Sequence, residues 1–470
     1  MKPVERLPPA LRRLVAATSF GFVVVQLDVT IVNVALPRIG AELGTGTDGL
    51  QWVVDAYTLA FAVFLLSAGV IGDRFGSKRA YLTGFWLFAT ASLACGLAGS
   101  GGFLVAARAV QGVGAALLVP NSLALLNHAT AHSPPLRAHA VGLWTAASAA
   151  AIACGPLTGA ILLGLFGWRS IFFANLPLCL LGLLLTRRAV PEKDRPEADH
   201  PLDWAGQALA VLVLTALTGA VIELRPLGLA HPVVLGGFAA ALLGGAAFLA
   251  VESRVREPML PLGFFRRPNF SAATVFGTLL NLTYYGVLFV LSLYLQQAHG
   301  YSPIRTGLAY LPLTATFVVS NLLSARLAAR RGPRLTMITG ALIGAAGFAL
   351  LSRLDAGSSF GSMLPAFVLI PGGMGLAVPA MTTAILSTVE RGRSGTASAV
   401  LNTARQAGGA IGVALFGALA AGAAPRIVGG LRASAVISTT LLLLGAGLAR
   451  AFLRDPDHIR PERFAEGPLE

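Results

Sequence analysis

The sequence predicts an all-α polytopic membrane protein with fourteen transmembrane helices, and three observations support this prediction. Of the 470 residues, 55% are hydrophobic and 12% are charged, about half the roughly 25% charged share of an average soluble domain. Fourteen runs are apolar over about 20 residues, the length that spans a bilayer. The Lys and Arg residues gather in alternate connections between these runs. Together these observations exclude a soluble enzyme and a disordered chain.

The apolar runs follow one another through most of the chain. Their approximate limits are 13–36, 50–71, 80–98, 103–127, 139–165, 168–187, 204–224, 231–252, 270–298, 305–328, 335–353, 360–386, 395–422 and 431–452. An even number of spans places both termini on the same side of the membrane.

The basic residues define the orientation of these spans. The two tails and the even-numbered connections hold 26 of the 35 Lys and Arg residues, the opposite connections hold seven, and two lie inside spans. The positive-inside rule therefore predicts that both termini are cytoplasmic. The net charge of +14 is then explained by anionic lipid rather than nucleic acid as the partner. With 32 Arg against three Lys, 54 Gly and 27 Pro, the composition is typical of a GC-rich bacterial genome, which places the protein in the bacterial inner (cytoplasmic) membrane.

Two sequence landmarks repeat along the chain. At an offset of 256 residues, Arg74, Gly76 and Lys78 match Arg330, Gly332 and Arg334. At an offset of 259 residues, Gly114 and Pro120 match Gly373 and Pro379. Such a repeat is typical of transporters built from two related halves. The expected organisation is an N-terminal six-helix bundle (1–188), a cytoplasmic linker (189–203), two additional transmembrane helices (204–252), a second cytoplasmic linker (253–269), a C-terminal six-helix bundle (270–454) and a cytoplasmic tail (455–470).

Several separate segments carry a resemblance to a known family. They are LDVTIVNVALPRI (27–39), GVIGDRFGSKR (69–79), RAVQGVGAALLVP (108–120), CGPLTGA (154–160), WRSIFFANLP (168–177), LDWAG (202–206), YLQQAHGYSPIRTGLAYLP (294–312) and NTARQAGGAIG (402–412). In this order they resemble the fourteen-span drug:proton antiporters of the major facilitator superfamily over essentially the whole chain. The resemblance implies the major facilitator fold and export of antibiotics or other drugs.

Three ionisable residues inside the spans are candidates for proton coupling. Asp28 lies near the middle of the first span, where a carboxylate costs roughly 2.5 to 3.5 kcal/mol on insertion scales. We expect it to bind and release a proton, the alternative being a permanently bonded structural carboxylate. Asp55 lies nearer an interface, so a functional and a structural role are equally favoured; the resemblance suggests recognition of organic cations there. Arg108 either pairs with one of these carboxylates, so that protonation switches the local charge, or ties its span to neighbouring carbonyls.

Two glycine-containing segments suggest how the carrier moves. The loop with Gly69, Asp73, Arg74, Gly76, Lys78 and Arg79 resembles the loop that latches the cytoplasmic side in this superfamily, although its basic residues also serve orientation. In the fifth span, Gly155, Pro156 and Gly159 permit close helix contact and a bend. This segment resembles the signature of exporters, with pure packing as the competing account.

The remaining candidates concern the substrate. Arg405 and Gln406 lie near the middle of the thirteenth span, where an Arg needs a partner from another span, a solvent-filled cavity or an anionic ligand. A binding cavity is mostly apolar with a few polar groups. The expected lining residues, besides Asp28 and Asp55, are Tyr57, Phe276, Asn281, Tyr284 and Tyr285.

No enzymatic activity and no cofactor or metal are expected. Cys95, Cys154 and Cys179 lack CxxC spacing, and no GxxxxGK[ST] sequence occurs, so metal binding and ATP-driven transport have no support. We expect a monomeric antiporter that exchanges protons for a hydrophobic, cationic or neutral drug-like molecule by alternating access. The alternatives are a proton-coupled symporter that imports a small molecule and a membrane receptor without transport.

Overall fold

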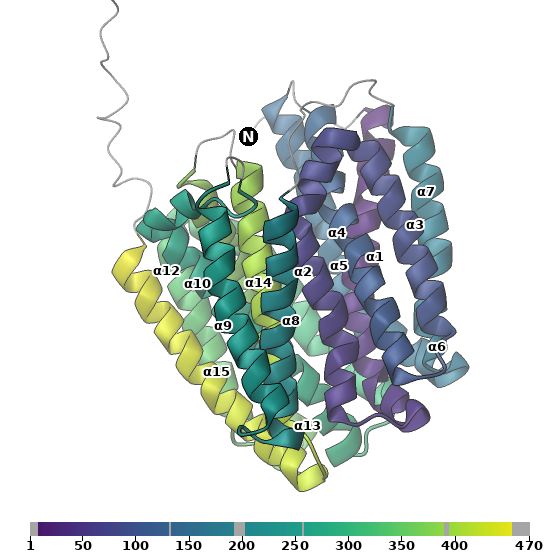
Figure 1. Ribbon diagram of the computed structural model, residues 1–470, viewed down its shortest axis with the longest axis vertical. Coiled ribbons are helices and arrows are strands. Elements are labelled where there is room, and N and C mark those ends of the chain that lie inside the picture. Colours follow the sequence, from purple (N-terminus) through teal and green to yellow (C-terminus); the bar gives the residue numbers. More distant parts are fainter. Residues whose placement is uncertain (1–7, 131–132, 192–202, 256–257, 390–393, 454–470) are drawn as a thin grey trace, which may run out of the picture.

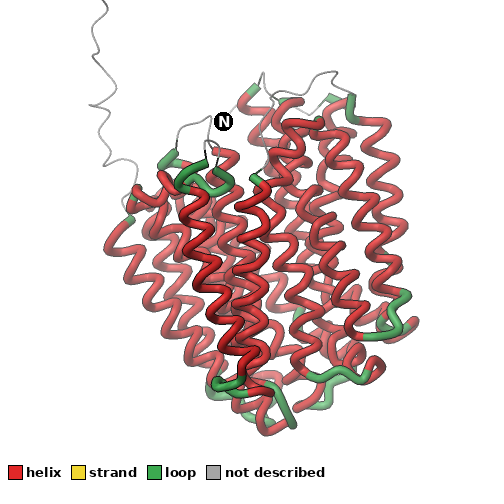
Figure 2. Tube along the Cα trace, viewed as in Figure 1, coloured by secondary structure: helices red, strands yellow, loops and turns green. Residues whose placement is uncertain are grey.

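The computed structural model describes residues 8–130, 133–191, 203–255, 258–389 and 394–453 (Figure 1). Within these ranges it consists of helices and loops and contains no strand (Figure 2). The tail at 455–470 and most of the linker at 189–203 lie outside the described residues. All fourteen apolar runs are helical.

The helices follow the order of the predicted spans. The first six spans are α1 (Pro9–Leu43), α2 (Thr47–Phe75), α3 (Ser77–Gly96), α4 (Gly101–Ala129), α5 (Pro134–Phe166), and α6 (Arg169–Phe173) with α7 (Asn175–Ala189). The next two are α8 (Trp204–Leu227) and α9 (Pro232–Glu252). η1 (Leu262–Arg266) lies in the second predicted linker. The last six spans are formed by α10 (Pro268–Leu293) with η2 (Tyr294–Ala298), α11 (Pro303–Ala309), α12 (Leu311–Leu351), α13 (Phe360–Leu386), α14 (Ser394–Ala420) and α15 (Ala424–Phe452).

Twelve helical segments among the described residues are long and apolar enough to cross a membrane. The two other predicted spans correspond to α3 and α14, which are helical but fall outside this set. The protein is therefore a multi-pass membrane protein.

Several predicted span boundaries differ from the structure. The sixth span is divided into α6 and α7, because Pro177 has no N–H to bond the carbonyl of Phe173 and so breaks the helix there. The tenth and eleventh spans join through Gly332, whose φ of 80° and ψ of 156° are not helical. The last span begins at Ala424 rather than 431.

The two halves use glycine in the same way. Gly76 between α2 and α3 has a φ of 94°, and Gly332 has a φ of 80°, a backbone region that favours glycine. A Cβ on Gly114 would lie 2.8 Å from the backbone N of Phe88 in α3, and one on Gly373 would lie 2.2 Å from the carbonyl O of Gly340 in α12. Both matched glycines thus let the fourth helix of a half approach its third.

The two additional helices form a hairpin on one face of the molecule. α9 packs against α8, and α8 contacts both α2 of the first half and α14 of the second (Figure 1). A Cβ on Gly219 of α8 would lie 3.2 Å from the Trp52 ring of α2. The hairpin therefore lies across the junction of the two halves.

We name the two ends of the bundle by their loops. The near end carries the start of α1 and the loops at Gly76 and Gly332, and the far end carries the α1–α2 and α5–α6 loops. The near end is at the top in Figure 1.

Candidate functional site

Asp28 lies at the centre of a buried polar cluster in the first half. Its Oδ2 accepts a hydrogen bond from Arg108 Nη1 at 2.5 Å, and its Oδ1 accepts from Gln111 Nε2 at 2.9 Å and from Asn175 Nδ2 at 2.8 Å. Both amides also donate to Ser92 Oγ, at 2.7 and 3.3 Å. These residues, called the Asp28 cluster below, come from α1, α3, α4 and α7, and each is at most 1% exposed. The cluster holds Asp28 and Arg108 as an ion pair.

Arg108 is fixed by more than the carboxylate. Its Nε donates to the carbonyl of Val53 at 3.2 Å, and its guanidinium lies over the ring of Tyr57, 4.2 Å from the centroid. A cation over an aromatic face is favourable, especially where water is excluded. Both sequence alternatives for Arg108, a carboxylate pair and a carbonyl contact, therefore occur together. Tyr57 packs on the cluster and does not line the cavity described below.

Asp55 does not join the Asp28 cluster. It is fully buried, and neither of its carboxylate oxygens has a hydrogen-bond partner among the described residues. Gln51, one turn earlier in α2, donates to α14 carbonyls, and the Ala62 carbonyl, two turns later, accepts from Thr403 of α14. Helical spacing places all three α2 residues on one face, so Asp55 lies on the side of α2 that packs against the second half.

Hydrogen bonds to backbone carbonyls join the two halves toward the far end. Gln51 Nε2 donates to the carbonyl of Ala414 at 2.6 Å, and Gln296 Nε2 donates to that of Val34 at 2.9 Å. Ser292 Oγ donates to the carbonyl of Asn33. That carbonyl lacks its usual helical donor, because the residue four positions later is Pro37. We call these contacts the far-end seal, and the described structure is closed there.

A small cavity lies between the halves on the near-end side of the far-end seal. It is lined from α1 and α5 on one side and from α10 to α12 on the other by Thr30, Asn33, Val34, Ile152, Pro156, Tyr284, Tyr285, Leu288, Tyr310, Leu313, Thr314 and Phe317. Tyr284 stacks on Phe317 with ring centroids 6.4 Å apart and meets Tyr285 edge-on at 5.5 Å. The volume of about 40 Å³ is far below the roughly 300 to 1,000 Å³ of drug-binding pockets. The site is therefore collapsed in this conformation.

The glycines of the fifth predicted span pack α5 onto α1. A Cβ on Gly155 would lie 1.9 Å from Thr30 Oγ1, and one on Gly159 would lie 2.9 Å from the carbonyl O of Ile31. Pro156 lines the cavity. These glycines therefore hold α5 close against α1, the helix that carries Asp28, and both helices contribute to the cavity wall.

Arg405 is held by neutral groups in the second half. Its Nε donates to Asn281 Oδ1 at 3.2 Å and its Nη1 to Asn402 Oδ1 at 3.4 Å. Asn281 thus contacts Arg405 rather than lining the cavity, while Phe276 packs near Gly445 of α15 and also lies outside it. Gln406 follows Arg405 in α14, is partly exposed and does not line the cavity.

The predicted gate loop lies at the near end. Asp73 and Arg79 are exposed, and Arg74 and Lys78 are half-buried. The Arg74 guanidinium lies 5.5 Å from the centroid of the Phe75 ring. Gly69 is in α2, and nothing lies within 4 Å of an ideal Cβ built on it.

Sequence reasoning missed several side chains of the Asp28 cluster and of the cavity. Gln111 and Asn175 contact Asp28, and Tyr310 and Phe317 line the cavity. Gln111 follows Arg108 by one helical turn, so helical spacing was an available signal for it. Asn175 carried no comparable signal, because its position depends on how α7 packs against α1.

This arrangement defines a class of protein: a multi-pass membrane transporter in which two helical halves enclose a cavity beside a buried ion pair. A family model described as the Major Facilitator Superfamily matches residues 18–413. The methylenomycin A resistance protein of Bacillus subtilis is 37% identical over 402 residues, which cover 85% of this chain and 86% of that protein. The tetracenomycin C resistance and export protein of Streptomyces glaucescens is 35% identical over 406 residues, covering 86% and 75%.

Solved structures support the same fold. The crystal structure of the human organic anion transporter MFSD10 (TETRAN) matches with a TM-score of 0.66 at 16% identity, covering 94% of this chain and all of that one. The chain belongs to the Major Facilitator Superfamily.

Proposed function

We propose that this protein is a proton-coupled antiporter that exports hydrophobic, cationic or neutral drug-like molecules across the bacterial inner membrane. The Asp28 cluster is the observation that carries the proposal, because a buried carboxylate paired with a permanently charged guanidinium changes the local net charge when it binds a proton. Bacterial relatives named for antibiotic resistance and export support the substrate class and the outward direction.

The proposed topology has fourteen spans with both termini in the cytoplasm. α3 and α14 are included because α3 packs on α4 and α14 packs on α2 and α10, inside the bundle of the other spans. The near end is then cytoplasmic, since its loops carry most of the basic residues. The functional unit is a monomer with two six-helix halves, 1–188 and 270–454, joined through the inserted helices.

The proposed cycle begins with the far end open and Asp28 accepting a proton from outside. The neutral carboxyl group loses its ionic attraction to Arg108, and the halves close at the far-end seal. Release of the proton to the cytoplasm restores the Asp28–Arg108 pair and accompanies substrate loading from that side. Tyr284 and Tyr285 are the proposed aromatic contacts for the substrate, and Asp55 is a second carboxylate for a cationic group. The loop from Gly69 to Arg79 is the proposed cytoplasmic gate.

The test is efflux of cationic, neutral and anionic fluorescent compounds from cells that express wild type, Asp28→Asn or the control Asp48→Asn. Asp48 is an exposed far-end carboxylate in the first turn of α2. We expect efflux that a protonophore abolishes, that Asp28→Asn loses and that Asp48→Asn retains. Uphill export by Asp28→Asn that still responds to a protonophore would contradict the coupling role.

Direction is tested in membrane vesicles of known orientation with an imposed pH gradient. Antiport predicts that substrate moves against the proton flux. Accumulation in the same direction as protons would instead identify a symporter, and binding without any flux would identify a receptor.

A further inference from the structure

A pair of carboxyl groups lies at the near end of the inserted hairpin, where α8 begins and α9 ends, far along the chain from the Asp28 cluster. Asp203 caps α8, with its Oδ1 accepting from the Gly206 N–H at 2.8 Å. Glu252 is the last residue of α9, and its Oε2 accepts from the Leu260 N–H at 2.9 Å. Each carboxyl group therefore uses one oxygen to hold the backbone at the near end of the hairpin.

The second oxygen of each group lies against Gly206 in the first turn of α8. Asp203 Oδ2 and Glu252 Oε1 are buried and have no donor among the described residues. A Cβ on Gly206 would lie 2.5 Å from the first oxygen and 2.6 Å from the second, so both oxygens lie beside the same point of α8. Glu252 is 3% exposed. Two neighbouring carboxylate oxygens are both acceptors, so they attract each other only when a proton lies between them.

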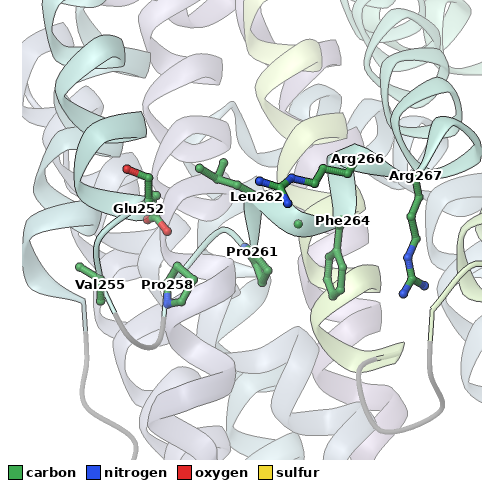
Figure 3. A pocket seen from close by; sticks show the side chains of 10 residues that line it. Glu252, Val255, Pro258, Pro261, Leu262, Phe264, Arg266 and Arg267 are labelled. Atoms are coloured by element: carbon green, nitrogen blue, oxygen red, sulfur yellow. The ribbon is translucent and has the colours of Figure 1, made fainter.

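The charged groups around the pair do not replace that proton within the described residues. Arg266 and Arg267 line the same cavity as Glu252, a space of about 550 Å³ between the end of α9 and η1. In Figure 3 Arg267 stands on the opposite side from Glu252 and Arg266 stands between them. Among the described residues neither Arg forms an ion pair with Glu252. Arg267 donates to the carbonyl of Thr388. Arg254 is exposed, Ser67 of α2 contacts Gln207 in the first turn of α8, and Arg256 lies outside the described residues. The cavity gives water access to Glu252.

We propose that Asp203 and Glu252 form a proton-binding site that holds the inserted hairpin closed at its near end. With one proton shared, the pair joins the start of α8 to the end of α9 and to the chain at Leu260. Loss of that proton leaves two like charges in contact, and the first turns of α8 become less stable. The near end is cytoplasmic in the proposed topology, so the proton comes from the cytoplasm.

The first turns of α8 contact α2 of the first half, and α8 also packs on α14 of the second half. Gln207 contacts Ser67 and donates to the carbonyl of Val63 at 3.3 Å, both in α2. α2 and α14 belong to the two halves that separate in the proposed cycle when the near end opens. The site therefore gives the hairpin a role. The hairpin links the two halves, and its stabilising effect on their near-end contact decreases as the cytoplasmic pH rises.

The experiment measures amide hydrogen exchange of residues 204–210 in the purified full-length protein at about pH 6 and about pH 9, expressed as protection factors. Transport is not involved, so the result is independent of the proposed antiport. In wild type we expect the protection to fall about tenfold or more at the higher pH. Each rise of one pH unit above the pKa of Glu252 lowers the protonated fraction of that side chain about tenfold. Glu252→Gln should match wild type at pH 6 and keep that protection at pH 9, because the Gln amide donates to Asp203 at every pH.

Two further variants complete the test. Glu252→Ala should show low protection at both pH values, and Glu223→Gln, a carboxylate at the other end of α8, should behave as wild type. If Glu252→Gln does not fold, Asp203→Asn carries the same expectation. Wild-type protection that is equal at the two pH values, or a fall that persists in Glu252→Gln, would overturn the proposal.

Discussion

Removing one charge of the Asp28–Arg108 pair should destabilise the protein far more than removing both. Asp28→Asn leaves the Arg108 guanidinium, which is 1% exposed, without a counter-ion. The Asn side chain also presents an NH₂ group either to Arg108 or to the two amides of Gln111 and Asn175, all of which are donors. Breaking a buried ion pair in this way costs about 3 to 5 kcal/mol. The double variant Asp28→Asn with Arg108→Gln removes both charges, so its cost should be about 2 kcal/mol or less, because neutral replacements of a buried pair are often tolerated.

The assay is a double-mutant cycle on the free energy of unfolding in detergent micelles with increasing SDS. We expect a coupling energy of about 3 kcal/mol or more for Asp28 and Arg108. The control pair is Arg38 and Glu42, an exposed i, i+4 contact at 2.7 Å, for which about 0.5 kcal/mol or less is expected. Additive destabilisation by the two buried substitutions would show that the charges do not depend on each other and would refute the reasoning.

Three more predictions follow from the geometry. Gly76→Ala should lower the free energy of unfolding by about 1 to 3 kcal/mol, because its φ is 94°, whereas Gly69→Ala, with open space in a helix, should not destabilise; SDS unfolding of both checks this. Gln51→Leu removes both hydrogen bonds from Gln51 to α14, each worth about 1 kcal/mol. Labelling of Asn33→Cys by an impermeant thiol reagent should therefore accelerate roughly thirtyfold, and an unchanged rate would contradict the seal. Tyr284→Ala should raise the KM for aromatic substrates about two- to tenfold and leave protonophore sensitivity intact; a KM that does not change would exclude Tyr284 from substrate contact.

The positions of the helices could be predicted because lipid imposes a simple rule. Each span must satisfy its own backbone hydrogen bonds, so an apolar run of about 20 residues is helical wherever it packs. All fourteen runs are helices. The interruption before Asn175 was missed because a proline inside an apolar run is compatible with either a kink or a break. The abrupt turn at Gly332 was placed between two spans by its match to Gly76.

The candidate site was only partly predictable. The cost of charge in a membrane singled out Asp28, Arg108, Asp55 and Arg405, and the first two meet at 2.5 Å. The other two do not meet them, since Arg405 contacts amide oxygens and Asp55 has no partner among the described residues. Neutral polar side chains cost less to bury in a membrane, so the sequence does not single them out. Their contacts depend on how each helix is rotated about its axis, which composition does not determine.

The proline in α1 also determines where water enters. Ser292 occupies the carbonyl of Asn33 while the far end is closed, and no helical N–H can take its place because Pro37 has none. When the halves separate, that carbonyl must be hydrated, since an unsatisfied buried acceptor costs about 1 to 3 kcal/mol. Asn33 lies five residues beyond Asp28, about 7.5 Å along the helix axis. Opening the far end thus requires hydration to within one and a half helical turns of the Asp28 carboxylate. The Asn33 carbonyl without a helical donor, which binds the second half in the closed state, therefore also sets how deep water must reach for protons to arrive at Asp28.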